Sequence, residues 1–240
     1  AQNPQKSVNF PPPNTAPVVI TSLRLSAAVA ISVFAGSVYG MSDVTHLGLY
    51  DIPMLSNIPN LVYLAPATKE EYLSMLDWAI EQKEHPVAVR VPGGPVISDG
   101  KEVKNNWSDL NKYEVTKNGS KIAVIALGTF YQLGEKAAKA IEEKAGITPT
   151  VINPHFISGI DKETLENLKK NHDIVITLED GILDGGFGEK IARFYGSSSV
   201  KTLCFGLAKK FYDRYDVNEL MREAHLTPAQ IADDATALLK

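Results

Sequence analysis

Apolar and polar positions along the chain fall into two successive blocks of strand and helix patterns. In the first block, β-branched runs at 18–20 and 29–35 and an apolar run at 60–65 predict strands, as does VAVRV at 87–91. A helix is predicted up to about Glu84, because Thr68 and Glu71 form a capping box. Its apolar positions recur at helical spacing: Tyr72, Leu73, Leu76, Ala79 and Ile80. Strand, helix, strand indicates a parallel sheet.

The second block begins at Lys121 and has the same alternation. KIAVIALGT is a continuous apolar run, which is typical of a strand whose two faces are both covered by helices. Further strands are predicted at 150–153, 173–178 and 200–205. Helices are predicted at 133–144, ended by Gly146, after Asp161, at 217–224 and after Thr227. The sequence therefore predicts an α/β protein with two parallel-sheet units.

Composition shifts give the expected boundaries of these units. Residues 1–17 hold five prolines and no periodicity, which predicts an extended arm. The first unit then covers 18–92. Residues 93–120 are rich in Gly, Asn, Asp and Lys without an apolar face, so we expect a linker there, with a short strand near 113–116. The second unit covers 121–240.

Bulk properties exclude several classes of partner. The net charge of −4 argues against nucleic acid, whose phosphates need a basic surface, and gives no attraction to a membrane. The longest apolar window, 25–39, is too short to cross a bilayer. Cys204 is the single cysteine, which predicts a buried structural thiol and a reducing, cytoplasmic setting. Since the chain begins with Ala1 rather than Met, we expect residues missing from its front.

The stretch with the most candidate chemistry is GMSDVTHLGLYD, residues 40–51. It puts Asp43 and His46 between two glycines, which let the backbone approach a ligand. A histidine near a carboxylate can be held in one tautomer and act as an acid, a base or a hydrogen-bond donor. On spacing alone, however, a single histidine in such a loop is more often an ordinary turn residue.

A longer pattern changes this balance. THLGLYDIPMLSNIPNLVYLAPATKEEYLSML, from Thr45 to Leu76, resembles the THxGxxDIxxLxxIPNxxxxxPxxxxEL segment of the transketolase-like thiamine-diphosphate enzymes, closest to the 1-deoxy-D-xylulose-5-phosphate synthases. The resemblance runs from about Val33 to the end of the chain. It implies the later part of a pyrimidine-binding domain followed by a transketolase C-terminal domain.

The resemblance has three departures. Family members carry a GIAEQ-like glutamate and a Phe-containing segment that contact the cofactor ring, whereas no Glu precedes Glu70 here. Family members have D-G-x-T-H, whereas Asp43 lies one residue closer to His46 and Ser42 takes the offset place. AVRYPRG reads AVRVPGG, so Gly93 replaces an arginine that helps to hold substrate phosphate. Arg90 is equally compatible with substrate binding and with a packed strand end.

Other candidates carry less weight. The glycine-rich turn 181–188 could cradle a phosphate, but it does not match GxGxxG, and nearby acidic residues would repel an anion. The resemblance makes this turn a structural feature. We expect His155, after a strand end, to be capped or to face solvent. No histidine, cysteine and carboxylate pattern suggests a metal site in this chain. The remaining histidines are scattered: His85, His172 and His225.

The resemblance implies a transferase that moves a two-carbon unit from a keto donor to an aldehyde sugar phosphate. His46 would be catalytic, and substrate binding would involve Asp43, Ser42 and Arg90. Thiamine diphosphate and magnesium would be held mainly by parts absent from this chain, so the chain alone would be inactive. We expect a homodimer or an N-terminal partner subunit. A non-catalytic binding or regulatory relative is the alternative, and a free-standing nucleotide-binding protein is the weakest hypothesis.

Overall fold

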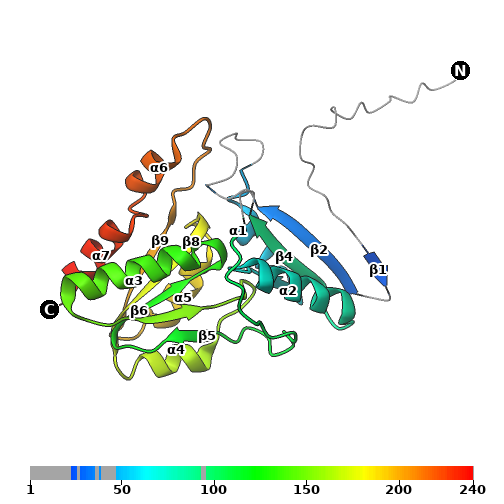
Figure 1. Ribbon diagram of the computed structural model, residues 1–240, viewed down its shortest axis with the longest axis horizontal. Helices are drawn as coiled ribbons and strands as arrows, with labels where there is room; N and C mark the ends of the chain where they lie inside the picture. Colours follow the sequence, from blue (N-terminus) through cyan, green and yellow to red (C-terminus); the bar gives the residue numbers. More distant parts are fainter. Residues whose placement is uncertain (1–22, 26–27, 36–37, 39–46, 93–95, 240) are drawn as a thin grey trace, which may run out of the picture.

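The computed structural model describes residues 23–25, 28–35, 38, 47–92 and 96–239. These residues form two α/β units that lie side by side, the first blue to cyan and the second green to red (Figure 1). The predicted arm at 1–17 and the predicted strand at 18–20 lie outside the described residues, as do four residues singled out above: Ser42, Asp43, His46 and Gly93. The predicted α/β class with parallel sheets is confirmed.

The first unit contains a sheet of strand order β1-β2-β4-β3 in its described part. The strands are β1 (Leu23–Leu25), β2 (Ala28–Ala35), β3 (Val62–Leu64) and β4 (Val87–Pro92). β2, β4 and β3 are parallel, whereas β1 is antiparallel to β2. The helices are the short α1 (Asp51–Leu55) and α2 (Lys69–Glu81). The strand, helix, strand reading of residues 60–91 is therefore confirmed.

Helix α2 starts as predicted but buries a different face. The Thr68 hydroxyl accepts a hydrogen bond from the Glu71 N–H and caps the helix. The helix ends at Glu81 rather than near Glu84. Two of the predicted apolar positions, Leu73 and Ile80, are exposed. Of the predicted positions, Ala79 is buried as expected, but the rest of the buried stripe is formed by Glu71, Met75 and Trp78. Met75 and Trp78 pack with Ala79 against β3 and β4.

The second unit has a sheet of order β5-β7-β6-β8-β9. Its strands are β5 (Glu114–Lys117), β6 (Lys121–Ala126), β7 (Thr150–Asn153), β8 (His172–Ile182) and β9 (Lys201–Leu207). Only β5 is antiparallel among these described strands. The helices are η1 (Gly128–Phe130), α3 (Tyr131–Ala145), α4 (Lys162–Leu168), α5 (Phe187–Tyr195), α6 (Val217–Glu223) and α7 (Pro228–Ala237).

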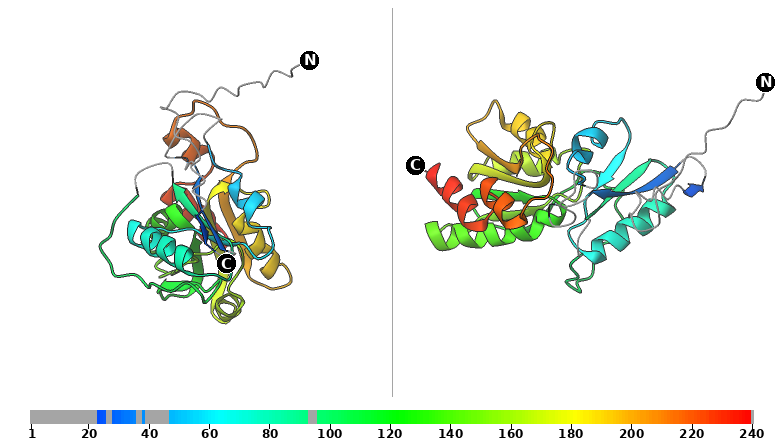
Figure 2. Two further views of the ribbon diagram at one scale, coloured as in Figure 1. Left: turned by 90° about the vertical axis from the view of Figure 1, so that its right-hand side faces the viewer. Right: turned by 90° about the horizontal axis from the view of Figure 1, so that it is seen from above.

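Both faces of this second sheet are covered, as its continuous apolar strands predict. Ile122 and Val124 of β6 pack toward α3 and α7, which lie side by side (Figure 2). Ala123 and Ile125 point the other way, toward α4 and α5. The predicted caps are confirmed: Asp161 accepts from two N–H groups of α4, Thr227 accepts from the Gln230 N–H, and Gly146 ends α3 in the left-handed region.

The two units are joined by main-chain hydrogen bonds as well as by side chains. The Ala65 N–H donates to the His155 carbonyl oxygen, and the Ile157 N–H donates to the Tyr63 carbonyl oxygen, each at 2.7 Å. Residues 155–157 of the second unit therefore extend the first sheet beyond β3 with an antiparallel bridge. Residues 96–113 also connect the units. Trp107 in this segment is completely buried against α2, a contact that the polar composition of the segment did not predict.

Candidate active site at the junction of the two units

Strands β2 and β4 end next to each other at one edge of the first sheet, and most of the predicted site residues follow β2 in the sequence. Ala35 pairs with Pro92 at the carboxyl ends of these parallel strands. Residues 39–46, called here the site segment, follow β2 in the sequence, and Gly93 follows β4. Ligands of open α/β sheets bind outside the carboxyl ends of strands. The site segment holds three of the predicted residues, whose side chains lie outside the described part: Ser42, Asp43 and His46.

Arg90 is the predicted site residue that the structure does describe, and it is buried. Its Nε lies 2.7 Å from Asp51 Oδ2, and its Nη2 donates to the carbonyl oxygens of Gly48 at 3.3 Å and Asp180 at 2.5 Å. Burial alone would lower the pKa of Arg90, but the carboxylates of Asp51 and Asp180 raise it, so the guanidinium stays charged. The Tyr63 hydroxyl also donates to Asp51. This is the geometry of the packed strand-end arginine, one of the two readings of this residue.

Residues on both sides of the site segment are bound to strand β8 of the second unit. Before it, the Val38 N–H donates to Asp180 Oδ1 at 3.2 Å, and the Val38 carbonyl oxygen accepts from the Tyr215 hydroxyl. After it, the Leu49 carbonyl oxygen accepts from the Ile182 N–H at 3.1 Å. Both flanks are thus fixed by the second unit, and Arg90 binds the second flank as well. Sequence reasoning did not identify Asp180 as a partner of this region.

Glu179, the neighbour of Asp180, is a completely buried carboxylate at the start of α5. Its oxygens accept hydrogen bonds from the Phe187 N–H at 2.7 Å and the Gly188 N–H at 2.8 Å. Glycines make room for it: a Cβ at Gly186 would lie 2.5 Å from Oε2 of Glu179, and one at Gly206 would lie 3.2 Å from its Cγ. Burial raises the pKa of Glu179 to about 7, against the opposing effect of the two N–H groups and Arg90.

The glycine-rich turn after β8 therefore does cradle an anion, but the anion belongs to the chain itself. Free N–H groups at a helix N-terminus are what a phosphate would use, and at α5 a buried carboxylate already accepts from two of them. This explains why glycines cluster at 181–188 without matching a nucleotide motif. The structural reading of the turn agrees with this geometry.

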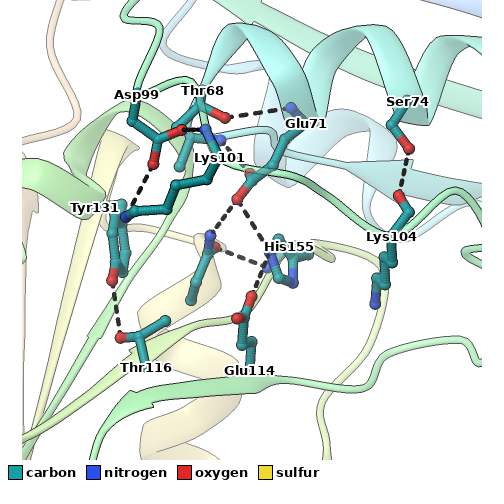
Figure 3. A network of polar contacts seen from close by, with 12 residues as sticks. Thr68, Glu71, Ser74, Asp99, Lys101, Lys104, Glu114, Thr116, Tyr131 and His155 are labelled. Carbon is teal, nitrogen blue, oxygen red and sulfur yellow. Dashed lines mark hydrogen bonds and ion pairs between the residues drawn. The ribbon is translucent and has the colours of Figure 1, made fainter.

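A second buried polar cluster lies where α2 meets the carboxyl end of β7 (Figure 3). The Glu71 carboxylate accepts from Asn153 Nδ2 at 2.9 Å and lies 3.3 Å from His155 Nε2. The same His155 nitrogen lies 3.5 Å from Glu114 Oε2, and the imidazole contacts the Trp107 ring edge-on. The expectation that His155 is capped or faces solvent was wrong as to solvent, because α2 and residues 96–113 cover it to 2 % exposure.

The other histidines in the described part of the chain do not converge on a site. His172 is buried and bonded to Thr150 and to the Leu168 carbonyl oxygen, and His225 is exposed beside Asp234. Among the described residues, no group of three or more histidine, cysteine or acidic side chains could hold a metal ion. With α5 filled by its own carboxylate, these residues do not fit the diphosphate and magnesium of a thiamine cofactor by themselves.

Cys204 lies on β9 and is half-buried rather than fully buried. Burial raises the pKa of its thiol above the ordinary value. A raised pKa leaves little thiolate, the reactive form, at neutral pH. The prediction of a structural thiol is therefore consistent with its surroundings.

Family models identify both units. The model of the transketolase C-terminal domain matches residues 111–231, and the model of the transketolase pyrimidine-binding domain matches residues 16–95. The two matches follow each other in the order in which the structure arranges the two α/β units. The chain belongs to the transketolase family.

Within that family, the chain is similar to 1-deoxy-D-xylulose-5-phosphate synthases. It is 30% identical to that of Shouchella clausii (strain KSM-K16) over 224 residues, which are 92% of this chain and 36% of that protein. It is 35% identical to that of Clostridium botulinum (strain Alaska E43 / Type E3) over 209 residues, 85% of this chain and 33% of that protein. The chain thus spans about a third of the length of these curated relatives.

Solved structures share the fold. A split-gene transketolase, described as an inactive tetramer of four beta subunits, superposes with a TM-score of 0.70 at 20% identity, covering 88% of this chain and 66% of that one. A transketolase from Pichia stipitis in complex with xylulose 5-phosphate gives a TM-score of 0.65 at 16% identity, over 86% of this chain and 30% of that one. No helix in the described part of the chain is long and apolar enough to span a membrane.

Proposed function

We propose that this chain is the C-terminal portion of a thiamine-diphosphate-dependent transferase of the 1-deoxy-D-xylulose-5-phosphate synthase type. The complete enzyme moves a two-carbon unit from a keto donor to an aldehyde sugar phosphate. The observation that carries the proposal is the match of both units to the family, in order, over about a third of the relatives' length. Without the remaining part, the chain is inactive.

In this proposal His46 is the catalytic residue of the chain. It donates hydrogen bonds to substrate hydroxyl groups and to oxygen atoms that gain negative charge during the reaction. Asp43 or Ser42 orients it or binds substrate beside it. The support is that the site segment follows β2 in the sequence, and that the carboxyl ends of β2 and β4 are paired at the edge where α/β sheets bind ligands.

Arg90 acts on the substrate indirectly in this proposal. It donates hydrogen bonds to Asp51, Gly48 and Asp180, so it holds the backbone that follows His46. Direct binding of substrate phosphate by Arg90 would require breaking its ion pair with Asp51 inside the protein. Gly93 stands where the family has its second arginine. The substrate phosphate is therefore bound by a residue other than Arg90 or Gly93.

The cofactor supplies the carbon–carbon bond chemistry when bound, and protein missing from this chain holds its diphosphate and magnesium. The partner is an N-terminal portion, either in the same polypeptide or as a separate subunit, and the assembly is a dimer in the cytoplasm. At the N-terminus of α5, where a diphosphate could bind, the Glu179 carboxylate already accepts from the Phe187 and Gly188 N–H groups, which supports this division of labour.

His46→Ala in the completed enzyme tests the proposal. We expect turnover to fall by two orders of magnitude or more while the thermal midpoint of unfolding changes little. His225→Ala is the matched control, because His225 is exposed and paired only with Asp234 among the described residues. A near-normal rate for His46→Ala would remove this residue from the mechanism.

The second candidate function is that of a non-catalytic relative which binds or regulates a partner. The glycine at position 93 and the lack of any glutamate before Glu70 favour it, since both remove groups that the catalytic family uses. Mixing the chain with an N-terminal portion separates the two candidates. Turnover that appears on mixing supports the transferase, whereas a stable but inactive complex supports the binding relative.

A further inference from the structure

The carboxylate of Glu179 occupies an unusual place for a charged group. It is completely buried at the junction of the two units, and it accepts hydrogen bonds from the Phe187 and Gly188 N–H groups. No lysine, arginine or histidine nitrogen of the described residues lies within 4.0 Å of it. A buried carboxylate without a paired cation is costly to ionise.

Groups from each surrounding element act on this carboxylate. On β4, Arg90 attracts its charge, and on α1, Asp51 repels it. On α5, the half-buried Lys190 attracts it, while burial lowers the pKa of that lysine to about 8. On β9, the Cys204 thiol is a neutral group whose pKa is raised by burial and, in part, by the charge of this carboxylate.

The two units meet at this place. Ile52 of α1 lies 3.2 Å from the position of a Cβ on Gly181 and packs in one apolar cluster with Phe187. The Ile182 N–H donates to the Leu49 carbonyl oxygen across the units. Separation of the units would admit water to the region around Glu179, and water stabilises the ionised carboxylate.

We propose that the packing of the first unit on the second is linked to a proton on Glu179, so that the junction is tighter in mildly acidic than in mildly alkaline solution. The role is independent of the proposed enzymatic function. The junction holds β8 of the second unit against residues 47–51, which follow the site segment. A change in its strength with pH near neutrality therefore acts on the part of the first unit next to the site segment.

The direction of the effect follows from the two protonation states. Burial raises the pKa of Glu179 from 4.5 to about 7 in the folded chain. The stabilising effect of the proton is complete below pH 4.5 and is lost as the pH rises through about 7. For one such group, the constant for opening the junction increases about 30-fold between pH 5.5 and pH 8.

Amide hydrogen exchange of the 240-residue chain tests this directly. The Ile182 amide reports opening of the junction, because its hydrogen bond crosses the two units. After correction for the intrinsic pH dependence of exchange, we expect its protection to fall about 30-fold from pH 5.5 to pH 8. In Glu179→Gln the protection should be independent of pH. Protection that is constant with pH in the unsubstituted chain would overturn the proposal.

Amide NMR shifts of Phe187 and Gly188 give a second readout that does not depend on the fold of the Gln variant. We expect both to titrate with a midpoint near pH 7, and Asp51→Asn to lower that midpoint because it removes a repelling charge. Asp184→Asn is the control, since this exposed carboxylate lies in the same turn. Absence of titration, or a midpoint unchanged by Asp51→Asn, would also overturn the proposal.

Discussion

The guanidinium of Arg90, on strand β4 of the first unit, donates a hydrogen bond to the main-chain carbonyl oxygen of Asp180, on strand β8 of the second. The Asp180 carboxylate in turn accepts from the Val38 N–H, immediately before the site segment. Arg90 also binds Gly48 and Asp51, just after it. One pair of residues, 90 positions apart, thus holds both flanks of the segment that contains the predicted catalytic histidine.

Loss of the Arg90 guanidinium should strongly destabilise the chain. Arg90→Met leaves the Asp51 carboxylate, which is 9% exposed, without its ion-pair partner, and breaking a buried pair costs about 3–5 kcal/mol. The free energy of unfolding in urea measures this. Arg193→Met is the matched control, because Arg193 is exposed on α5, and it should change stability by less than about 0.5 kcal/mol. Equal effects of the two substitutions would show that the Arg90 contacts contribute little.

The buried polar cluster around Glu71 should be a second place where hydrogen bonds hold the two units together. Glu71→Ala leaves the Ala67 N–H and the Asn153 side-chain amide without their acceptor inside the protein. Buried donors without partners cost about 1–3 kcal/mol each, so we expect a loss of about 3 kcal/mol. Glu81→Ala, at an exposed position of the same helix, is the control. Denaturation midpoints that coincide for the two variants would contradict this role.

Helix α3 packs on strand β6 through a glycine. A Cβ at Gly134 would lie 2.5 Å from the Ala126 Cβ, closer than atoms approach without displacement. Gly134→Ala should therefore destabilise the chain by about 1–3 kcal/mol despite the better helix propensity of alanine. Gly196→Ala meets its nearest neighbour at 3.5 Å and should be neutral or slightly stabilising. Thermal unfolding of both variants decides whether the close approach is real.

The Cys204 thiol should react slowly with an aromatic disulfide reagent. Burial raises its pKa, so the reactive thiolate is scarcer in the folded chain than in the unfolded one. We expect the rate at pH 7.5 to be at least about 10-fold lower in buffer than in urea, and to increase with pH. A folded-state rate equal to the unfolded rate would indicate an accessible, activated thiol instead.

Most of the strands and helices could be predicted from the sequence, because they depend on residues close together in the chain. Apolar runs gave the strands, and caps at Thr68, Asp161 and Thr227 marked helix starts correctly. The face of α2 was less readable. Leu73 and Ile80 have helical spacing too, and only the position of the sheet determines that Met75 and Trp78 are buried instead.

The contacts that organise the site region depend on residues far apart in the chain. His155 is buried by Glu71 and Trp107, and no local pattern around His155 indicates either partner. Arg90 could be placed at a strand end but not assigned to Asp51 or Asp180. The glycine-rich turn was an exception, because the acidic residues beside its glycines already argued against phosphate binding. One of them, Glu179, is the carboxylate that accepts from the Phe187 and Gly188 N–H groups.

In our proposal, this chain completes a thiamine-diphosphate transferase whose remaining part is separate from it. The most direct measurement mixes the purified chain with an N-terminal portion that corresponds to the first two-thirds of a 1-deoxy-D-xylulose-5-phosphate synthase, adds thiamine diphosphate and magnesium, and follows product formation from pyruvate and glyceraldehyde 3-phosphate. We predict no turnover with either part alone, and turnover on mixing that His46→Ala abolishes. Turnover by the chain alone, or a stable mixed complex without turnover, would contradict it.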